Sequence, residues 1–167
     1  MVNRIKLKPF KTEEDVREYI NLYNDMSERS VFDHLEQSSV EKILDKMNAE
    51  KVDNINYMIL NEKDQLIGTI GHKIQSDFEL VIGYRILKNE YRGKGYMTEA
   101  LKYYIQKLFS EDDKITRLTL QIHSKNIPSI KLAKKFGFTY EGTMREAYFY
   151  RGSKVGFEMY SLLRNEA

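Results

Sequence analysis

The sequence contains no cysteine, and it has only 9 glycines and 2 prolines among 167 residues. The absence of cysteine excludes a disulfide framework, cysteine-ligated zinc, iron–sulfur clusters and a cysteine nucleophile, and it fits a reducing, intracellular setting. The small share of glycine and proline argues against a disordered chain. Hydrophobic residues make up 41% of the sequence, so we expect a globular protein with a core of its own.

The sequence also lacks a long hydrophobic run and a strong excess of charge of one sign. No stretch approaches about 18 apolar residues, and the first residues contain no hydrophobic signal core. We therefore expect a soluble, cytoplasmic protein that does not bind membranes. The 27 basic and 25 acidic residues give a formal net charge of +2. Because this excess is small, we expect no bulk affinity for nucleic acid, and any anion-binding site has to be local.

The hydrophobic pattern predicts one α/β domain over residues 1–167, with a mixed central sheet flanked by about four helices. We expect strands at residues 2–10, 56–60, 66–71, 78–87 and 117–122, and two closing strands within 139–163. Thr12 is predicted to cap a helix that ends near Asn24, and the capping-box sequence 38–41 to start a second one. A third helix follows the glycine-containing loop after residue 91. A fourth is predicted between Asn126 as its N-cap and Gly137 as its C-terminal stop.

The strongest chemical signal is the sequence Arg-Gly-Lys-Gly-Tyr at residues 92–96, between a predicted strand and a predicted helix. Its glycines allow the backbone to approach a ligand closely, and the start of a helix presents unpaired N–H groups. Arg92 and Lys94 add cationic donors, so this loop is predicted to bind a phosphate or pyrophosphate. An ordinary loop with a basic tip is the alternative.

Spacing excludes two common nucleotide-binding loops. A Walker A loop needs glycine five residues before Gly93, where Lys88 stands, and Ser or Thr after Lys94, where Gly95 stands. A Rossmann fingerprint needs a third glycine at the position of Thr98.

With these motifs the sequence resembles the GNAT family of N-acetyltransferases, whose acetyl-CoA loop has the pattern Arg/Gln-x-x-Gly-x-Gly/Ala. Arg92 and Gly95 match its first two fixed positions, and Met97 departs from the third. Further on, the sequence 126–129 (Asn-Ile-Pro-Ser) and the sequence 136–142 (Phe-Gly-Phe-Thr-Tyr-Glu-Gly) resemble the second half of the family pattern. The resemblance covers about residues 80–165 and is strongest to the ribosomal-protein alanine N-acetyltransferase branch.

The resemblance implies that acetyl-CoA is the co-substrate. It implies that the backbone at Arg85, Ile86 and Leu87 binds the pantetheine and the acetyl carbonyl, and that Asn126 contacts the pantetheine arm. The loop that it places around the pyrophosphate consists of Arg92, Gly93, Lys94, Gly95, Tyr96, Met97 and Thr98. The cations Lys131, Lys134 and Lys135 either reach the nucleotide phosphates or are simply solvated.

Acyl transfer to an amine needs a neutral amine, a polarised thioester carbonyl and a proton for the departing thiolate. Without cysteine, direct attack in a ternary complex is the economical mechanism. The resemblance makes Ser129 the candidate acid, because Ala133 occupies the family's usual tyrosine position. Tyr148 stands where the branch carries a glutamate, and Val81 where the family often has a carboxylate. The base therefore stays open: Glu79, Glu146 or Tyr148 through water, or an amine that arrives deprotonated.

The resemblance implies that the acceptor is a primary amine, either a protein N-terminus or a small molecule such as a polyamine. Two other functions remain open: a non-catalytic acyl-CoA-binding sensor, and an RNA- or ribosome-binding module that uses the lysine-rich helix. The spacing of His34, His72 and His123 does not indicate a metal site, and His34 is a candidate for the acceptor pocket. The aromatic tail is compatible with a homodimer through the last strands.

Overall fold

The computed structural model describes residues 4–25, 27, 39–48 and 54–167. Its strands are β1 (Lys6–Pro9), β2 (Asn54–Leu60), β3 (Leu66–Ser76), β4 (Glu79–Ile86), β5 (Arg117–His123), β6 (Thr139–Tyr150) and β7 (Ser153–Leu163). Its α-helices are α1 (Glu13–Asn24), α2 (Val40–Asn48), α3 (Tyr96–Glu111) and α4 (Ile127–Lys135), and its 3₁₀ turns are η1 (Asn89–Tyr91) and η2 (Arg164–Glu166).

The strands form one sheet in the order β1-β2-β3-β4-β5-β7-β6. Strands β4 and β5 are parallel over three residue pairs, from Glu79↔Arg117 to Val81↔Thr119. The pairs β1–β2, β5–β7 and β6–β7 are antiparallel. The predicted class, α/β with a mixed sheet and four helices, is thereby confirmed.

The chain divides into two compact units. The boundaries between them fall within β3, β4 and α3, so each unit contains part of these three elements. The first comprises residues 1–71 and 84–101, and the second comprises residues 72–83 and 102–167. That the whole chain is one domain stays a prediction.

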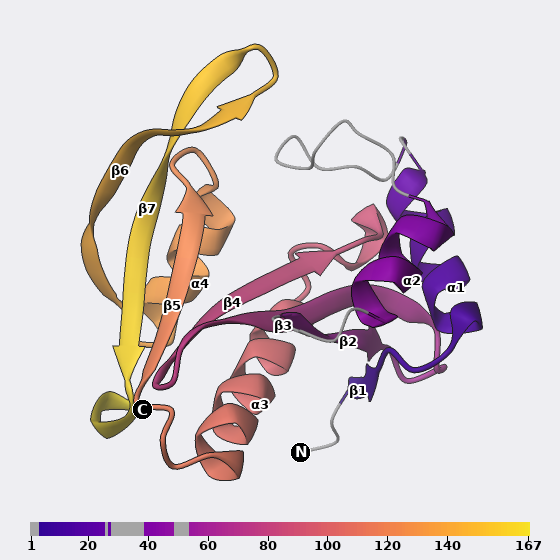
Figure 1. Ribbon diagram of the computed structural model, residues 1–167, viewed down its shortest axis with the longest axis horizontal. Coiled ribbons are helices and arrows are strands. Elements are labelled where there is room, and N and C mark those ends of the chain that lie inside the picture. Colours follow the sequence, from indigo (N-terminus) through magenta and orange to yellow (C-terminus); the bar gives the residue numbers. More distant parts are fainter. Residues whose placement is uncertain (1–3, 26, 28–38, 49–53) are drawn as a thin grey trace. The chain divides into compact units, whose positions relative to one another are not determined.

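In the first unit, α1 begins where the sequence predicts. The Thr12 side chain accepts a hydrogen bond from the Asp15 N–H (3.1 Å), and the Asp15 carboxylate accepts one from the Thr12 N–H (3.0 Å). This reciprocal capping box satisfies backbone donors at the start of the helix, and α1 ends at Asn24 as predicted. Helices α1 and α2 lie side by side (Figure 1).

The core of the first unit joins the central strands to α1. Met58, Leu60, Leu66 and Leu87 are buried together, and aromatic side chains of the N-terminal region, among them Tyr19, pack against them. The last residue before the predicted phosphate loop, Leu87, thus belongs to the hydrophobic core and gives that loop a fixed starting point.

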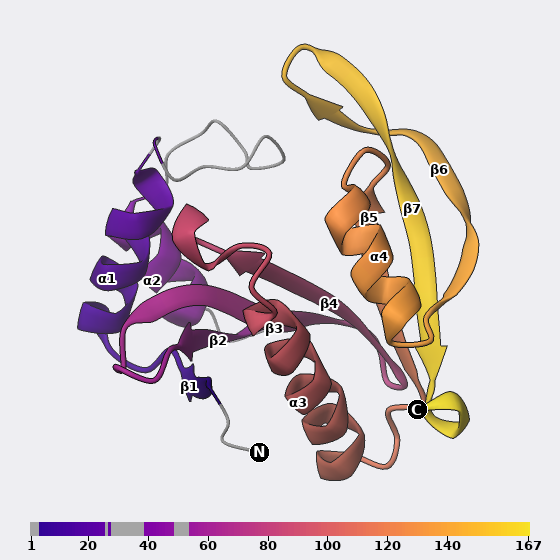
Figure 2. The same ribbon diagram turned by 180° about the vertical axis from the view of Figure 1, so that it is seen from behind.

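In the second unit, α4 lies beside β5 (Figure 2). Asn126 is its N-cap and accepts from the Ser129 N–H (3.3 Å), and Gly137 follows it with φ +77°. Both ends were predicted from the sequence. The buried Ala133, Phe138 and Tyr160 anchor the helix and the closing strands in the core.

Several strands differ from the predictions, and β2 begins at Asn54 instead of residue 56. Strand β1 spans Lys6–Pro9 within the predicted range 2–10, of which residues 2 and 3 lie outside the described residues, and β3 continues five residues beyond Gly71 to Ser76. Strand β6 is irregular: its register to β7 shifts between Tyr140 and Gly142 and again between Met144 and Tyr148. Within the second shift Glu146 adopts φ +49°, so this part of β6 is a bulge.

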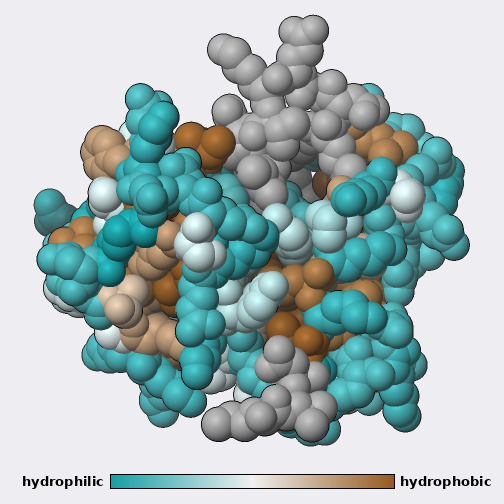
Figure 3. Space-filling model, turned by 90° about the horizontal axis from the view of Figure 1, so that it is seen from below, coloured by the Kyte–Doolittle hydropathy of each residue, from teal (hydrophilic) through white to brown (hydrophobic). Residues whose placement is uncertain are grey.

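The surface in Figure 3 is mostly hydrophilic, with smaller hydrophobic areas between the charged side chains. Among the described residues, the large hydrophobic side chains that are most exposed all belong to the second unit. They are Ile74, Phe78, Tyr103, Ile127, Tyr140, Met144, Phe149 and Leu163. Among the described helices, none is long and apolar enough to cross a membrane.

Candidate active site

The end of β4 has two different edges. The Leu87 N–H donates to the Ile67 carbonyl of β3 (2.8 Å), so Leu87 directs its backbone groups toward β3. Because successive residues of a strand direct these groups to opposite edges, the N–H and carbonyl of Ile86 point away from β3. Of the predicted pantetheine-binding residues, Ile86 therefore has the backbone N–H best placed to meet a ligand.

Gly68 allows β3 to approach this strand end closely. A Cβ built at Gly68 would lie 2.5 Å from the Arg85 carbonyl oxygen and 3.1 Å from the Ile86 Cδ1. No side chain fits at the first of these distances, so glycine is required here. The Arg85 guanidinium lies over the Tyr23 ring, 4.9 Å from its centroid, and fixes the strand end to α1.

The predicted phosphate loop closes back on β4 through Arg92. The guanidinium donates to the Ile86 carbonyl from Nε (3.2 Å) and from Nη2 (3.0 Å), and it also donates to the Asn89 side chain. The sequence predicts Arg92 as a phosphate donor, whereas the structure shows that its side chain holds the loop. Lys94 is exposed at the loop and leaves its ammonium group available to an anion.

The two loop glycines are needed for their conformation. Gly93 has φ +71° and Gly95 has φ +87°, both in the left-handed region that side chains disfavour. Gly95 then starts α3, since its carbonyl accepts the first helical hydrogen bond, from the Glu99 N–H (3.1 Å). The N–H groups of Tyr96, Met97 and Thr98 have no acceptor within the helix. Consecutive donors at a helix start form a typical anion site.

A further group holds this loop and was not found by the sequence reasoning. The Arg4 guanidinium donates to the Lys94 carbonyl (3.2 Å from Nη2) and to the Glu99 carboxylate (2.6 Å from Nε). It also lies over the Tyr96 ring, 4.7 Å from its centroid. The hydrogen bond to Glu99 raises the pKa of Arg4 above its ordinary value. A sequence separation of about 90 residues leaves no local signal for these contacts.

The second unit contains the predicted residues Asn126, Ser129 and Tyr148. Asn126 uses Oδ1 for the helix cap, and Ser129 lies half-buried in the first turn of α4. Ala133, at the family's tyrosine position, is fully buried in the same helix. Lys131, Lys134 and Lys135 are exposed on α4.

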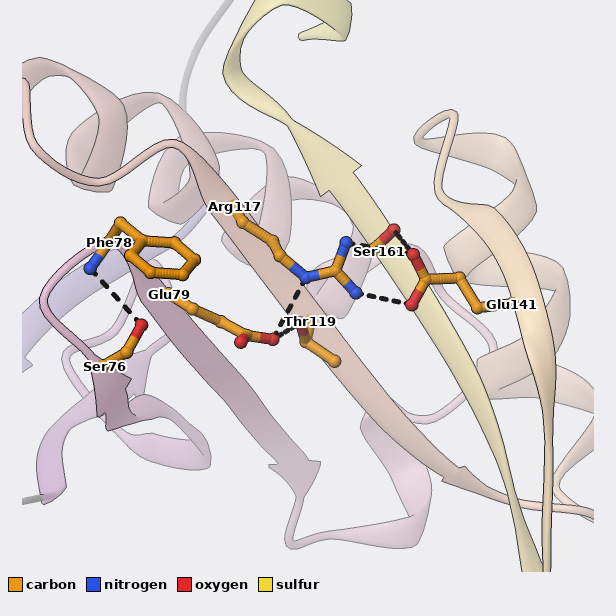
Figure 4. Close-up of polar contacts among 7 residues, drawn as sticks. All are labelled: Ser76, Phe78, Glu79, Arg117, Thr119, Glu141 and Ser161. Carbon is orange, nitrogen blue, oxygen red and sulfur yellow. Dashed lines mark hydrogen bonds and ion pairs between the residues drawn. The ribbon is translucent and has the colours of Figure 1, made fainter.

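The candidate base Glu79 takes part in an ion-pair network at the start of β4 (Figure 4). Its carboxylate accepts from the Thr119 hydroxyl (2.5 Å) and from Arg117 Nε (3.1 Å). Arg117 also donates to Glu141 (2.9 Å from Nη1), which in turn accepts from the Ser161 hydroxyl (2.8 Å). The hydrogen bond to Glu141, together with that to Glu79, raises the pKa of Arg117. Through these partners Glu79 helps to join the first residues of β4, β5 and β6 to the end of β7, so it is a poor candidate base.

The other candidates for the base lie on β6. Glu146 is exposed in the bulge and pairs with Lys154 (2.9 Å). Tyr148 follows the bulge, pairs in register with Val155 and packs its ring 5.7 Å from that of Phe157. Of the two, the half-buried Tyr148 is better shielded from solvent.

Glu158 on β7 is a half-buried carboxylate that the sequence reasoning did not single out. It accepts a hydrogen bond from the Thr143 hydroxyl (2.8 Å). Hydrogen bonds from Ser124 and Thr143 lower its pKa below the ordinary value, so it is ionised at neutral pH. Its sequence signal is a charged residue two positions before the buried Tyr160 on the same face of a strand. Its partner Ser124 lies two residues before Asn126, the N-cap of α4. An ionised carboxylate at this place would attract a cationic amine.

Of the three histidines, His72 and His123 belong to the described part of the chain. His34 lies outside the described residues. His72 Nδ1 is 2.7 Å from the Tyr104 hydroxyl, and His123 accepts from the Lys125 N–H (3.1 Å). Burial lowers the pKa of both described histidines. No group of three or more His, Asp or Glu side chains that could hold a metal occurs among the described residues.

Residues 4–139 match the family model of the acetyltransferase (GNAT) domain. The chain therefore belongs to the GNAT acetyltransferases, an acyltransferase family that uses acetyl-CoA, and the family expected from the loop and the second-half motifs is confirmed.

One curated relative is an uncharacterized N-acetyltransferase, p20, of Bacillus licheniformis. It is 32% identical over 111 residues, which cover 65% of this chain and 61% of the relative, so the chain matches less than two thirds of that protein's length.

Solved structures share the fold over nearly the whole chain. The spermidine N-acetyltransferase of Vibrio cholerae, in complex with CoA and spermine, is 17% identical with a TM-score of 0.82, covering 98% of this chain and 97% of that one. The ribosomal L7/L12 alpha-N-protein acetyltransferase RimL, in complex with CoA, is 18% identical with a TM-score of 0.81, covering 98% and 96%. At these identities the similarity shows the fold alone.

Proposed function

We propose that the chain transfers an acetyl group from acetyl-CoA to a primary amine by direct attack in a ternary complex. The observation that carries this proposal is the arrangement of β4, the loop and α3. Left-handed glycines at 93 and 95 bring the backbone into reach of a ligand, and the N–H groups of 96–98 lie together at the start of a 16-residue helix. This is a site for a pyrophosphate.

In this proposal the loop residues have separate roles. The N–H groups of Gly95, Tyr96, Met97 and Thr98 bind the pyrophosphate, and Lys94 adds charge. Arg92 keeps the loop closed on β4 through the Ile86 carbonyl. The Ile86 N–H, directed away from β3, is the donor for the acetyl carbonyl or the pantetheine. A donor at the acetyl carbonyl stabilises the charge that develops on its oxygen during attack.

The second unit supplies the side chains for proton transfer. Asn126 uses its Oδ1 in the helix cap, so its Nδ2 is the group that would donate to the pantetheine arm. We assign the Ser129 hydroxyl as the proton donor to the departing thiolate. We assign Tyr148, acting through a water molecule, as the base. This leaves Glu79 and Glu146 to their ion pairs.

Both acceptor classes, a protein N-terminus and a small amine, stay in the proposal. The name of one structural neighbour gives spermidine as its substrate and that of another gives a ribosomal protein N-terminus. The ionised Glu158 favours an acceptor that arrives as a cation, a property that both classes share. A direct comparison of spermine with N-terminal peptides, each assayed by thiol release from acetyl-CoA, separates them.

The first experiment is a thermal melt of the wild type and of Gly95→Asp with and without acetyl-CoA. At about 100 times the dissociation constant, binding adds about 2.7 kcal/mol, or roughly 5–10 °C for a chain of this size. We expect this shift in the wild type and its loss in Gly95→Asp, because a side chain is strained at φ +87° and its Cβ would lie 3.2 Å from Arg4 Nη2, a group that holds the loop.

Gly152→Asp is the matched control, because Gly152 has a similar φ of +78° and open space around its Cα. It should keep the full shift with acetyl-CoA. A folded wild type that shows no shift would refute the proposal. Binding without turnover of any amine would instead identify an acyl-CoA sensor. RNA binding that falls steeply with salt and ignores acetyl-CoA would identify a nucleic-acid module.

A further inference from the structure

We propose that Arg4 is a positioning residue for the acetyl-CoA loop, which it holds in the binding conformation without contacting the phosphates itself. This inference rests on the proposed function. It assigns a role to the segment before β1, more than 80 residues away in sequence from the loop that it holds.

The contacts of Arg4 fix both ends of the left-handed turn at Gly95. On one side the guanidinium donates to the Lys94 carbonyl from Nη1 (3.3 Å) and Nη2 (3.2 Å). On the other side it donates to Glu99, whose own N–H closes the first helical hydrogen bond with the Gly95 carbonyl. A planar guanidinium suits two such partners at fixed angles, whereas an ammonium group does not.

The direction of the Lys94 carbonyl determines the direction of a binding group. In a trans peptide the carbonyl and the following N–H point to opposite sides. Holding the Lys94 carbonyl toward Arg4 therefore directs the Gly95 N–H away from Arg4, to the open side of the turn. If that peptide rotated, the loop would present a carbonyl where a phosphate needs a donor.

Electrostatics favour positioning over direct attraction. The Glu99 carboxylate neutralises Arg4, because the two side chains form an ion pair, in which 40% of the Arg4 side chain and 33% of the Glu99 side chain are exposed. A neutralised pair adds little net positive field for a pyrophosphate. Aromatic contacts also hold Arg4 in place. Its guanidinium lies over the Tyr96 ring, which packs edge-on against the Tyr91 ring with 5.4 Å between the ring centroids. The Tyr91 hydroxyl in turn accepts a hydrogen bond from Nδ2 of Asn61, in the turn between β2 and β3 (3.0 Å).

The test compares Arg4→Met, Arg4→Lys and Lys6→Met in the full chain. Lys6 is the matched control, because it is a cation on β1 whose ammonium group pairs with the exposed Asp64, away from the loop. We expect Arg4→Met to raise the dissociation constant for acetyl-CoA about tenfold or more, since a charge-assisted anchor is lost. Arg4→Lys should not restore affinity, and Lys6→Met should stay within about twofold of the wild type.

Hydrogen exchange of the unliganded protein gives the second readout. The amides of residues 95–98 should exchange faster in Arg4→Met and Arg4→Lys than in Lys6→Met, while core amides such as those of β5 stay equally protected. Glu99→Met should weaken acetyl-CoA binding as well, and combining it with Arg4→Met should add little, because the two residues act as one unit.

Two results would overturn the inference: Arg4→Met binding acetyl-CoA as tightly as Lys6→Met, or Arg4→Lys regaining full affinity, which would show that charge alone matters. If the wild type fails to bind acetyl-CoA, the proposed function fails. The exchange of residues 95–98 would then still decide whether Arg4 holds this loop.

Discussion

The two units hold their candidate site residues in different ways. In the first unit the candidate groups are backbone N–H groups of nearly consecutive residues. The side chains of Arg4 and Arg92 hold the loop that carries them, through hydrogen bonds to backbone carbonyls. In the second unit the candidates are the side chains of Ser129 and Tyr148, on different elements. A backbone site is encoded by a local motif, whereas a proton-transfer site depends on strand register and on which carboxylates are already paired.

The largest effect should come from Gly68→Ala, because a Cβ there would lie 2.5 Å from the Arg85 carbonyl oxygen. We expect a loss of about 3 kcal/mol in the free energy of unfolding, since backbone has to move. Gly83→Ala on β4 is the control: no atom lies within 4 Å of its added Cβ, so stability should change little. Urea unfolding measures both. Equal stability of the two variants would contradict the close approach of β3 and β4.

Ser129→Ala tests the second unit. If the hydroxyl protonates the thiolate, kcat should fall about a hundredfold, which corresponds to about 2.7 kcal/mol, with the dissociation constant for acetyl-CoA unchanged. Steady-state kinetics with an accepted amine and calorimetry with acetyl-CoA measure the two quantities. An unchanged kcat would exclude Ser129 as the proton donor, and it would then be only a polar residue in the first turn of α4.

Arg117→Met should destabilise the protein without affecting the cofactor loop. It leaves the Glu79 and Glu141 carboxylates without their shared cation, at a side chain only 24% exposed, and we expect a cost of about 2 kcal/mol. Lys154→Met removes an exposed ion pair with Glu146 and should cost about 0–1 kcal/mol. Urea unfolding of both variants is the measurement. A much weaker affinity of Arg117→Met for acetyl-CoA would show that the two regions are coupled.

The smallest effect concerns the first unit and depends on pH. Burial alone would raise the pKa of Asp15, but hydrogen bonds from Lys8 and from the Lys11 and Thr12 N–H groups outweigh it and lower the pKa from 3.8 to about 2. A carboxyl whose pKa is lower in the folded state stabilises the fold above its unfolded pKa, and this contribution disappears as pH falls toward the folded pKa.

Asp15→Asn should therefore cost about 2 kcal/mol or less at pH 7, and the difference from the wild type should shrink between about pH 4 and pH 2. Glu13→Gln, on the exposed face of α1, is the control and should change the free energy of unfolding little at pH 7 and at pH 2. Unfolding by urea at several pH values measures this. A difference that persists at pH 2 would mean that the charge of Asp15 is not its source.

Local signals explain what the sequence predicted well. Thr12 and Gly137 mark helix ends because capping and left-handed φ depend on single residues and their immediate neighbours. Gly93 and Gly95 identify the loop for the same reason. The predicted end of the strand at Gly71 was wrong, because tertiary pairing carries β3 on to Ser76 past a residue that by itself disfavours a strand.

Long-range contacts explain what the sequence did not predict. The pairing of Arg4 with Glu99 spans 95 positions, and that of Arg117 with Glu79 spans 38. Neither follows from periodicity, because both depend on strand order and register. The same limit applies to the acid and base, since the bulge before Tyr148 decides where that side chain points along β6.

The bulge in β6 also has a consequence for solubility. Strand β6 is an edge of the sheet and carries the exposed Met144 and Phe149, a combination that in a straight strand would recruit other chains by backbone pairing. The two register shifts and the left-handed Glu146 interrupt the row of evenly spaced donors and acceptors that such pairing needs. The irregular edge therefore protects the protein against edge-to-edge aggregation while keeping its hydrophobic side chains on the surface.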